Sequence, residues 1–269
     1  MSHPEKFFEK VKSSVFEILT PSGSGGTGFL ARPDGLIITN AHVVMPDRAV
    51  KIRDCHGNEE ICRVIKSDRN RDLAAVHFAP KANSQQCQPL PLLAKSRKLN
   101  AGQDVFTIGC PGGCSSLSFV GGYISATSFQ PDHNQLPFVQ LNLSVNPGNS
   151  GGPVLLQSGE VVAVMAHYRL ASDGQRIEGL SFGIPSGDVQ QFMDSIPDLP
   201  KNSGEFQYCV VCGDFVKPDK YCSHCGVPLE TGDPKISLGT IEGQCPTCGN
   251  LASADGKYCD SCGSSLSEN

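Results

Sequence analysis

The chain has 269 residues, of which 18% are charged, and its formal net charge at neutral pH is −5. This length allows a large hydrophobic core with a small second module. The moderate charge excludes a wholly disordered chain and argues against a polybasic surface for nucleic acid. Many glycines and prolines, with few aromatic residues, are typical of short strands joined by turns.

The first nineteen residues mix apolar and charged side chains. Apolar positions recur at spacings near three and four between Phe7 and Leu19, which predicts a short amphipathic helix that runs into a first strand and packs on the main domain. This stretch lacks the continuous apolar segment of a signal peptide, and no run in the chain approaches the length of a membrane span. We therefore expect a cytoplasmic protein that does not enter a membrane. An oligomer formed through the N-terminal helix stays an open alternative.

From Phe29 to Ile184, short apolar runs alternate with turn residues. The runs of strand length are 36–39, 50–52, 73–78, 105–108, 138–143, 154–156 and 161–165. No long helical pattern interrupts them, so the periodicity predicts a mostly β domain. A closing helix is predicted over 187–196, because Pro197 ends the apolar pattern there.

A glycine-rich turn surrounds Ser150, in the run 148–153. Glycine permits the backbone angles of a tight turn, and N–H groups beside the serine can converge on a developing oxyanion. His42 and Asp72 lie upstream, and a histidine, an acid and a serine in this order can form the activated nucleophile of a serine hydrolase. A buried structural histidine is the alternative for His42. Asp68 competes with Asp72, but the apolar run directly after Asp72 places that residue at the mouth of a strand.

Four motifs in order over residues 23–187 resemble the HtrA/DegP branch of the trypsin-like serine proteases. They are 25–30 with 34–44, 72–76, 102–112 and 146–153. The resemblance implies two antiparallel β-barrels of the chymotrypsin type with the site between them. It also implies His42 as general base, Asp72 as its orienter and Ser150 as nucleophile, with the N–H groups of Gly148 and Ser150 forming the oxyanion hole. This chemistry needs no cofactor. Unlike most members of that family, the chain leaves no room for a PDZ domain.

The resemblance also implies residues that contact the substrate. Ser144 matches the floor of the specificity pocket in trypsin-like enzymes, and because it is not an acid we do not expect a preference for Lys or Arg. Met165, Ala166 and His167 are expected to form a pocket wall, where HtrA enzymes usually have Asn-Thr-Ala. We expect cleavage after a small or medium apolar residue. Selection of an acidic or polar residue by His167, and a solvent-facing His167, are the alternatives.

The C-terminal tail contains an internal repeat of four Cys-x-x-Cys pairs, each followed by glycine. The eight cysteines are Cys209, Cys212, Cys222, Cys225, Cys245, Cys248, Cys259 and Cys262. Four thiolates on two such turns make a closed tetrahedral Zn²⁺ site with no position for substrate. The repeat therefore predicts a double zinc ribbon with two structural Zn²⁺ ions, and redox dithiols are the alternative.

The tail is acidic. Residues 201–269 contain five lysines, no arginine and nine acidic residues, a formal charge of −4, and each Cys₄–Zn²⁺ site is itself formally negative. Such a surface opposes phosphate binding, so we expect a protein partner, or regulation of the protease, in place of nucleic acid.

Five further cysteines do not belong to these pairs: Cys55, Cys62, Cys87, Cys110 and Cys114. An odd number cannot pair completely within one chain, and in a reducing compartment all five are thiols. A small loop or redox switch closed by Cys110 and Cys114 is the alternative.

The predicted organisation is a trypsin-like serine protease domain over 1–198, a linker over 199–207 and a double zinc ribbon over 208–269. The leading hypothesis is a serine endopeptidase that cleaves protein or peptide substrates through an acyl-enzyme, with the ribbons serving recognition or regulation. The alternative is a zinc-ribbon interaction module that carries a latent or regulatory protease domain.

Overall fold

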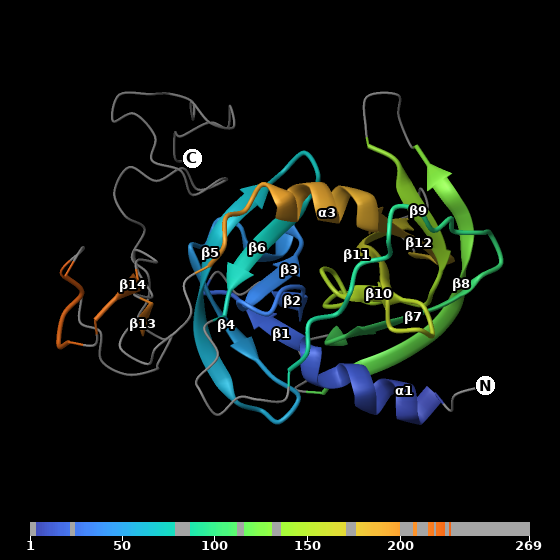
Figure 1. The fold of residues 1–269 in the computed structure, drawn as a ribbon. Helices are drawn as coiled ribbons and strands as arrows, with labels where there is room; N and C mark the ends of the chain where they lie inside the picture. The colour runs from blue at the N-terminus through green and yellow to red at the C-terminus, as the bar shows by residue number, and fades with distance from the viewer. Residues whose placement is uncertain are drawn as a thin grey trace, which may run out of the picture.

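The computed structural model describes residues 4–21, 25–78, 87–111, 116–130, 136–170, 176–199, 207–208, 215–217, 219–223 and 226. Most of them form two closed six-stranded antiparallel barrels that lie side by side (Figure 1). The strands of the first barrel run in the order β1-β2-β3-β6-β5-β4, and those of the second in the matching order β7-β8-β9-β12-β11-β10. This architecture confirms the mostly β, two-barrel fold predicted from the sequence.

The first barrel contains β1 (Val15–Leu19), β2 (Gly25–Leu30), β3 (Leu36–Thr39), β4 (Ala49–Arg53), β5 (Glu59–Asp68) and β6 (Leu73–His77). The alternation of side chains along a strand explains why the first three residues of β3 are all apolar. Ile37 belongs to the core inside the barrel, while Leu36 and Ile38 belong to a second cluster shared with the other barrel. Both faces of the strand are therefore buried.

The second barrel contains β7 (Asp104–Gly109), β8 (Ser118–Phe129), β9 (Phe138–Asn142), β10 (Pro153–Leu155), β11 (Val161–Leu170) and β12 (Arg176–Pro185). Its internal core includes Val105, Ile124 and Leu141. Residues of alternating position, such as Ile108 and Val164, join the cluster that lies between the barrels. The two barrels are thus held together by apolar packing that neither provides alone.

Helices cover this arrangement from outside. α3 (Ser186–Asp194) lies across both barrels, and its Val189, Phe192 and Met193 are buried in the shared cluster (Figure 1). α1 (Pro4–Val11) and the short 3₁₀ helix η1 (Lys12–Ser14) precede β1, and Phe7 of α1 packs at 5.4 Å from the ring of Phe106 in β7. These elements confirm the two predicted helices. None of the described helices is long and apolar enough to span a membrane.

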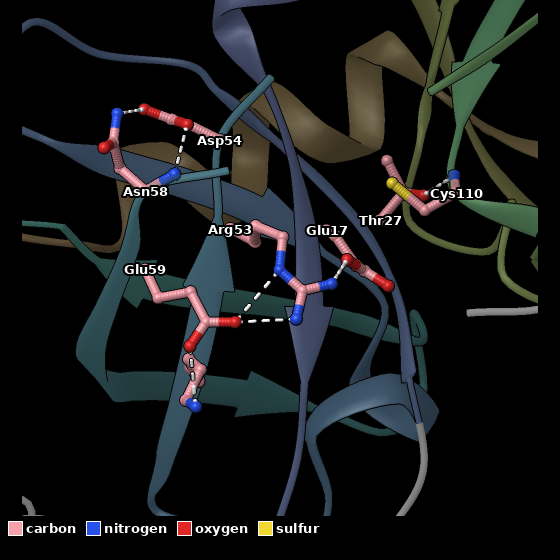
Figure 2. Close-up of polar contacts among 8 residues, drawn as sticks. Glu17, Thr27, Arg53, Asp54, Asn58, Glu59 and Cys110 are labelled. Atoms are coloured by element: carbon pink, nitrogen blue, oxygen red, sulfur yellow. Dashed lines mark hydrogen bonds and ion pairs between the residues drawn. The ribbon is translucent and has the colours of Figure 1, made fainter. Parts of the chain in front are cut away.

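A buried carboxylate lies at the wall of the first barrel. Glu17 in β1 is 3% exposed, and its Oε2 accepts a hydrogen bond at 2.6 Å from Nη1 of Arg53 in β4. Arg53 also pairs with Glu59 in β5 (Figure 2). The second carboxylate oxygen of Glu59 pairs with Lys51 at 2.8 Å. Opposite charges on three neighbouring strands compensate the cost of burying Glu17.

Only parts of the tail are described. β13 (Gln207–Tyr208) and β14 (Phe215–Val216) form a two-stranded antiparallel sheet. All predicted zinc ligands except Cys222 lie outside the described residues, so the predicted zinc-ribbon module stays a prediction.

Candidate active site

His42 and Asp72 meet at one edge of the first barrel. β3 and β6 are paired, with Thr39 opposite Ala74, and His42 follows β3 on the short helix α2 (Ala41–Val44) while Asp72 immediately precedes β6. Asp72 Oδ2 lies 2.7 Å from His42 Nδ1, and Asp72 Oδ1 accepts the backbone N–H of His42 at 3.0 Å. Because β3 and β6 are paired, a residue that follows one strand and a residue that precedes the other are in direct contact.

This contact defines the chemistry of the imidazole. A carboxylate can only accept, so the proton of a neutral His42 ring lies on Nδ1 and the lone pair on Nε2. The His42 side chain is 50% exposed, which leaves Nε2 accessible to a proton donor. A ring oriented in this way is equipped to act as a general base.

Asp72 is held in an unusual backbone conformation. Its φ is +52°, the only positive value among the described non-glycine residues, in a region that aspartate tolerates better than most residues. The side chain of Asn40 donates to the Asp72 carbonyl at 2.9 Å and so fixes this turn. Sparsely populated conformations of this kind concentrate at functional sites.

Asp68, the competing acid, is engaged elsewhere. Its carboxylate accepts from the side chain of Arg71 at 2.8 Å and from the Arg71 backbone N–H. Partial burial raises the pKa of Asp68, but the hydrogen bonds and charge of Arg71 outweigh it, so the net shift is downward. The structure places Asp72, and not Asp68, against His42.

Ser150 lies on a tight turn at the edge of the second barrel. The N–H of Asn149 donates to Asn146 O at 3.0 Å, and Gly148 has φ +99°. Proline at 147 cannot take a positive φ, so this combination is a type II turn, which requires a residue such as glycine at its third position. Among the described residues, the N–H groups of Gly148 and Ser150 donate no hydrogen bond. Both predicted oxyanion donors are thus unengaged.

The Ser150 hydroxyl is directed to the second barrel. It donates to the Ala166 carbonyl at 3.1 Å, and within the described part of the chain it makes no hydrogen bond to the His42 ring. Catalytic hydrogen bonds are often absent or long until substrate binds, so the predicted roles of His42, Asp72 and Ser150 stay predictions.

The four predicted substrate-contacting residues have different surroundings. Ser144 is exposed after β9, whereas the side chains of Met165 and Ala166 are buried in β11. His167 is exposed, but its ring packs edge-on against Phe138 at 5.0 Å. Desolvation lowers the pKa of His167; the nearby His42 lowers it further, and Asp72 opposes the shift.

Sequence reasoning missed Thr27, which contacts the serine turn from the first barrel. Its hydroxyl donates to Gly148 O at 2.7 Å, and its backbone N–H donates to Ser150 O at 2.8 Å. The signal was its position in the strand Gly25-Gly26-Thr27-Gly28, because glycines inside a buried strand mark the close approach of another backbone. A Cβ on Gly26 would indeed lie 2.9 Å from Ser150 O.

No group of three or more metal-ligating side chains is placed to hold an ion within the residues that the structure describes. Cys222 is buried, and its carbonyl accepts the N–H of Gly226 at 2.9 Å, with Gly226 at φ +74°. Of the remaining cysteines, Cys110 is buried, and desolvation raises its pKa to about 12, which keeps it a protonated thiol. Its predicted alternative partner, Cys114, lies outside the described residues.

A family model places most of both barrels among known enzymes. Residues 26–164, just over half of the chain, match the trypsin-like peptidase domain. The matched region contains His42, Asp72 and Ser150 together with the strands that carry them.

Curated relatives match the same part of the chain. A probable periplasmic serine endoprotease of the DegP-like type from Hahella chejuensis is 34% identical over 178 residues, which are 65% of this chain and 36% of that protein. A Do-like HtrA serine protease from Lactobacillus helveticus is 33% identical over 180 residues, or 65% and 42% of the two chains. The chain thus spans less than half the length of these relatives. The matches confirm the predicted resemblance to HtrA/DegP proteases for the barrels.

Solved structures share the fold. An HtrA-type protease, AlgW, determined with a tripeptide, superimposes with a TM-score of 0.63 and 24% identity over 72% of this chain and 63% of that one. The serine endoprotease from Yersinia pestis gives a TM-score of 0.59 and 23% identity over 72% and 66%. At these identities the likeness shows the chymotrypsin-like double barrel alone.

The relatives overturn the predicted cytoplasmic location. Several of them are named periplasmic serine endoproteases, which contradicts that prediction. The wrong prediction came from the composition of the first nineteen residues. The structure uses that segment for α1, η1 and β1, so its mixture of charged and apolar residues reflects packing on the barrels and carries no information on destination.

Proposed function

The chain belongs to the trypsin-like peptidase family, and from this premise we propose that it is a serine endopeptidase that cleaves protein or peptide substrates through an acyl-enzyme. The observation that carries the proposal is the 2.7 Å contact between His42 and Asp72, with Ser150 on a tight turn attached to the same barrel through Thr27. The enzyme class predicted from the sequence agrees with the family and with the curated relatives.

In the proposed mechanism, Asp72 orients His42 and stabilises its protonated form. The Ser150 hydroxyl leaves the Ala166 carbonyl, donates to Nε2 of His42 and attacks the substrate carbonyl. The N–H groups of Gly148 and Ser150 then bind the oxyanion. His42 returns the proton to the leaving amine, and water hydrolyses the acyl-enzyme. These steps need no cofactor.

We further propose cleavage after a small or medium apolar residue. Ser144 supplies no negative charge to a basic side chain, and the packing of His167 on Phe138 and Phe182 offers an apolar wall. The lowered pKa of His167 keeps the ring uncharged at neutral pH, which argues against selection of an acidic residue.

The boundary of the protease domain is proposed near residue 198. Arg32 donates to the carbonyls of Ile196 and Pro197 at 3.0 and 2.9 Å, and the N–H of Leu199 donates to Asp34 at 3.0 Å. These bonds support a domain that ends where the chain leaves the first barrel, followed by a linker over 199–207 and the ribbon module over 208–269.

For the tail we propose two structural Zn²⁺ ions, each bound by four of the eight paired cysteines, with a protein partner for the ribbons. The left-handed conformation of Gly226, directly after Cys225, supports the tight turn that such a site needs. When bound, the ions supply folding free energy to a module with few apolar side chains.

Labelling with a fluorophosphonate tests the activity. The wild type is expected to react and to hydrolyse a peptide library, whereas Ser150→Ala loses both the label and several orders of magnitude of turnover with its thermal melting unchanged. Ser158→Ala, a matched variant in an exposed turn, keeps both. Equal turnover in the wild type and Ser150→Ala would refute the proposal. A folded wild type that resists the label would favour the alternative of a latent protease domain.

A further inference from the structure

Thr27 lies at the centre of the contact between the two barrels. It belongs to β2 of the first barrel and is fully buried. Four hydrogen bonds converge on it: two go out to Gly148 and Ser150, one comes in from Cys110, and one comes in from Thr39. Three of these four partners belong to the second barrel and its loops, so one residue registers the serine turn against the barrel that carries His42.

The direction of each bond is unambiguous. The backbone N–H of Cys110 can only donate, and it reaches Thr27 Oγ1 at 3.0 Å (Figure 2). A threonine hydroxyl has a single proton, which therefore points to the Gly148 carbonyl at 2.7 Å. On the opposite side, Thr39 donates from its hydroxyl to the Thr27 carbonyl at 2.7 Å, three residues before His42. Both hydrogen-bond donors of Thr27 are thus engaged, and its hydroxyl and carbonyl oxygens each accept one bond.

Thr27 donates to the carbonyls of Gly148 and Ser150, and the N–H groups of the same two residues are the predicted oxyanion donors. Along the chain, the peptide units that carry these N–H groups therefore alternate with the units that carry the two carbonyls. The N–H of Gly148 belongs to the peptide unit before Gly148, and the N–H of Ser150 to the unit before Ser150. The unit between Gly148 and Asn149 separates these two donors, and its carbonyl is the one that accepts the Thr27 hydroxyl. Each peptide unit is planar, so the bond to this carbonyl fixes the plane of the unit between the two donors, and either N–H group can reorient against it only by rotation about the φ and ψ angles of Gly148 or Asn149.

The packing around Thr27 leaves little room for the turn to move otherwise. A Cβ on Gly151 would lie 2.1 Å from the Thr27 carbonyl oxygen and 2.2 Å from the Thr39 hydroxyl. The Thr27 methyl group lies 3.4 Å from the position of a Cβ on Gly152. Gly151 and Gly152 of the turn therefore both pack closely against Thr27. The Thr27 hydroxyl binds the Gly148 carbonyl of the same turn.

We propose that Thr27 is a positioning residue for the transition state: its hydroxyl sets the orientation of the Gly148 and Ser150 N–H groups and the register of Ser150 against His42. The inference rests on the proposed serine endopeptidase function. Thr27 itself touches no reacting atom and acts through the turn that it holds. Loss of the hydroxyl leaves the half-buried Gly148 carbonyl and the buried Cys110 N–H without their partner, and the turn then reorients to satisfy them.

The test compares Thr27→Val, which keeps the shape, with Thr27→Ser, which keeps the hydroxyl. Thr107→Val is the matched control, because Thr107 is 1% exposed and its hydroxyl has no hydrogen-bond partner among the described residues. We expect Thr27→Val to lower kcat by about 10- to 100-fold with little change in KM, since an oxyanion donor displaced by about 1 Å costs that much. Its affinity for a peptide boronic acid is expected to fall in parallel, while affinity for a product peptide stays constant.

Rescue and control complete the design. Thr27→Ser is expected to restore kcat to within a few fold of the wild type, and Thr107→Val to leave it unchanged. Equal kcat in folded Thr27→Val and Thr107→Val would overturn the positioning role while the wild type stays active and labelled. If Thr27→Val does not fold, Thr27→Ala, which also lacks the hydroxyl, takes its place with the same expected loss, and a kcat equal to that of Thr107→Val would again overturn the proposal. A wild type that is neither labelled nor active would overturn both this role and the proposed function.

Discussion

Gly151 allows a quantitative test of how tightly the two barrels approach at the serine turn. Its φ of +84° strains any side chain, at a cost of about 1–2 kcal/mol. A Cβ there would also lie 2.1 Å from the Thr27 carbonyl oxygen, more than an ångström inside an ordinary contact. Relief of this overlap costs about 1–3 kcal/mol more, as in an overpacked core. Gly151→Ala is therefore expected to lose about 2–5 kcal/mol of stability, or about 4–20 °C in Tm for a domain of this size.

The matched variant is Gly159→Ala. Gly159 has φ +93°, but a Cβ there would meet nothing within 4 Å, so this variant carries the backbone penalty alone and is expected to lose about 2–8 °C. Turnover separates the two further: displacement of the turn by about 1 Å lowers kcat of Gly151→Ala by about 100-fold, while Gly159→Ala keeps it. Differential scanning fluorimetry and peptide hydrolysis measure both. The same Tm and the same kcat for the two variants would refute the close approach described for Gly151.

Three more outcomes are expected. The buried His77 has a pKa lowered from 6.5, chiefly by desolvation; the unfolded chain therefore takes up a proton that the folded chain refuses, and stability falls as pH drops below 6.5. Urea unfolding at about pH 7.5 and about pH 5.5 measures the stability lost between the two pH values. This loss should be smaller for His77→Gln than for the wild type and the exposed control His56→Gln, and equal losses would contradict the role of His77. Arg53→Met leaves the buried Glu17 carboxylate without its cation and should lower the free energy of unfolding by about 3 kcal/mol. Arg97→Met, in an exposed pair, should lower it by at most about 1 kcal/mol. Chemical denaturation measures both variants, and similar losses would count against a buried pair. Metal analysis should find two Zn²⁺ per chain, and chelation should reduce cleavage of a recruited protein more than hydrolysis of a short peptide; protein purified without chelator and free of zinc would disprove the metal sites.

Apolar runs of strand length, as in β3 and β6, predicted a mostly β domain, and the resemblance to HtrA/DegP proteases implied its two barrels. Longer strands were less visible: β5 and β8 carry charged or small residues at many positions and show no continuous apolar run. The contact of Asp72 with His42 followed from motifs placed directly at strand ends. The orientation of the Ser150 hydroxyl toward Ala166 could not be predicted, because a side-chain rotamer depends on neighbours that are distant in sequence.

Thr27 shows the limit of sequence reasoning most clearly. Its role depends on Cys110 and Gly148, partners more than eighty residues away. The glycines beside Thr27 indicate that another backbone approaches closely, but they do not identify which one. The cellular location was predicted wrongly for a related reason. The composition of the N-terminal segment reflects its packing on the barrels, where Phe7 contacts Phe106 and Phe119. Motifs of characteristic residue types, such as those around His42, Asp72 and Ser150, could thus be recognised in the sequence. Contacts that form only when distant segments pack together could not.

Because each barrel closes its own ladder of strands, and both do so in the same order, neither half depends on the other to pair its edges. In the proposed mechanism, however, turnover depends on groups from both halves and on the few bonds that align them. Substitutions on the outer wall of one barrel are thus expected to be tolerated. A small displacement of one barrel relative to the other would change the rate of turnover without unfolding either barrel. A chain cut between residues 78 and 104 would make a split reporter whose signal measures the docking of two pieces that each pair their own strand edges.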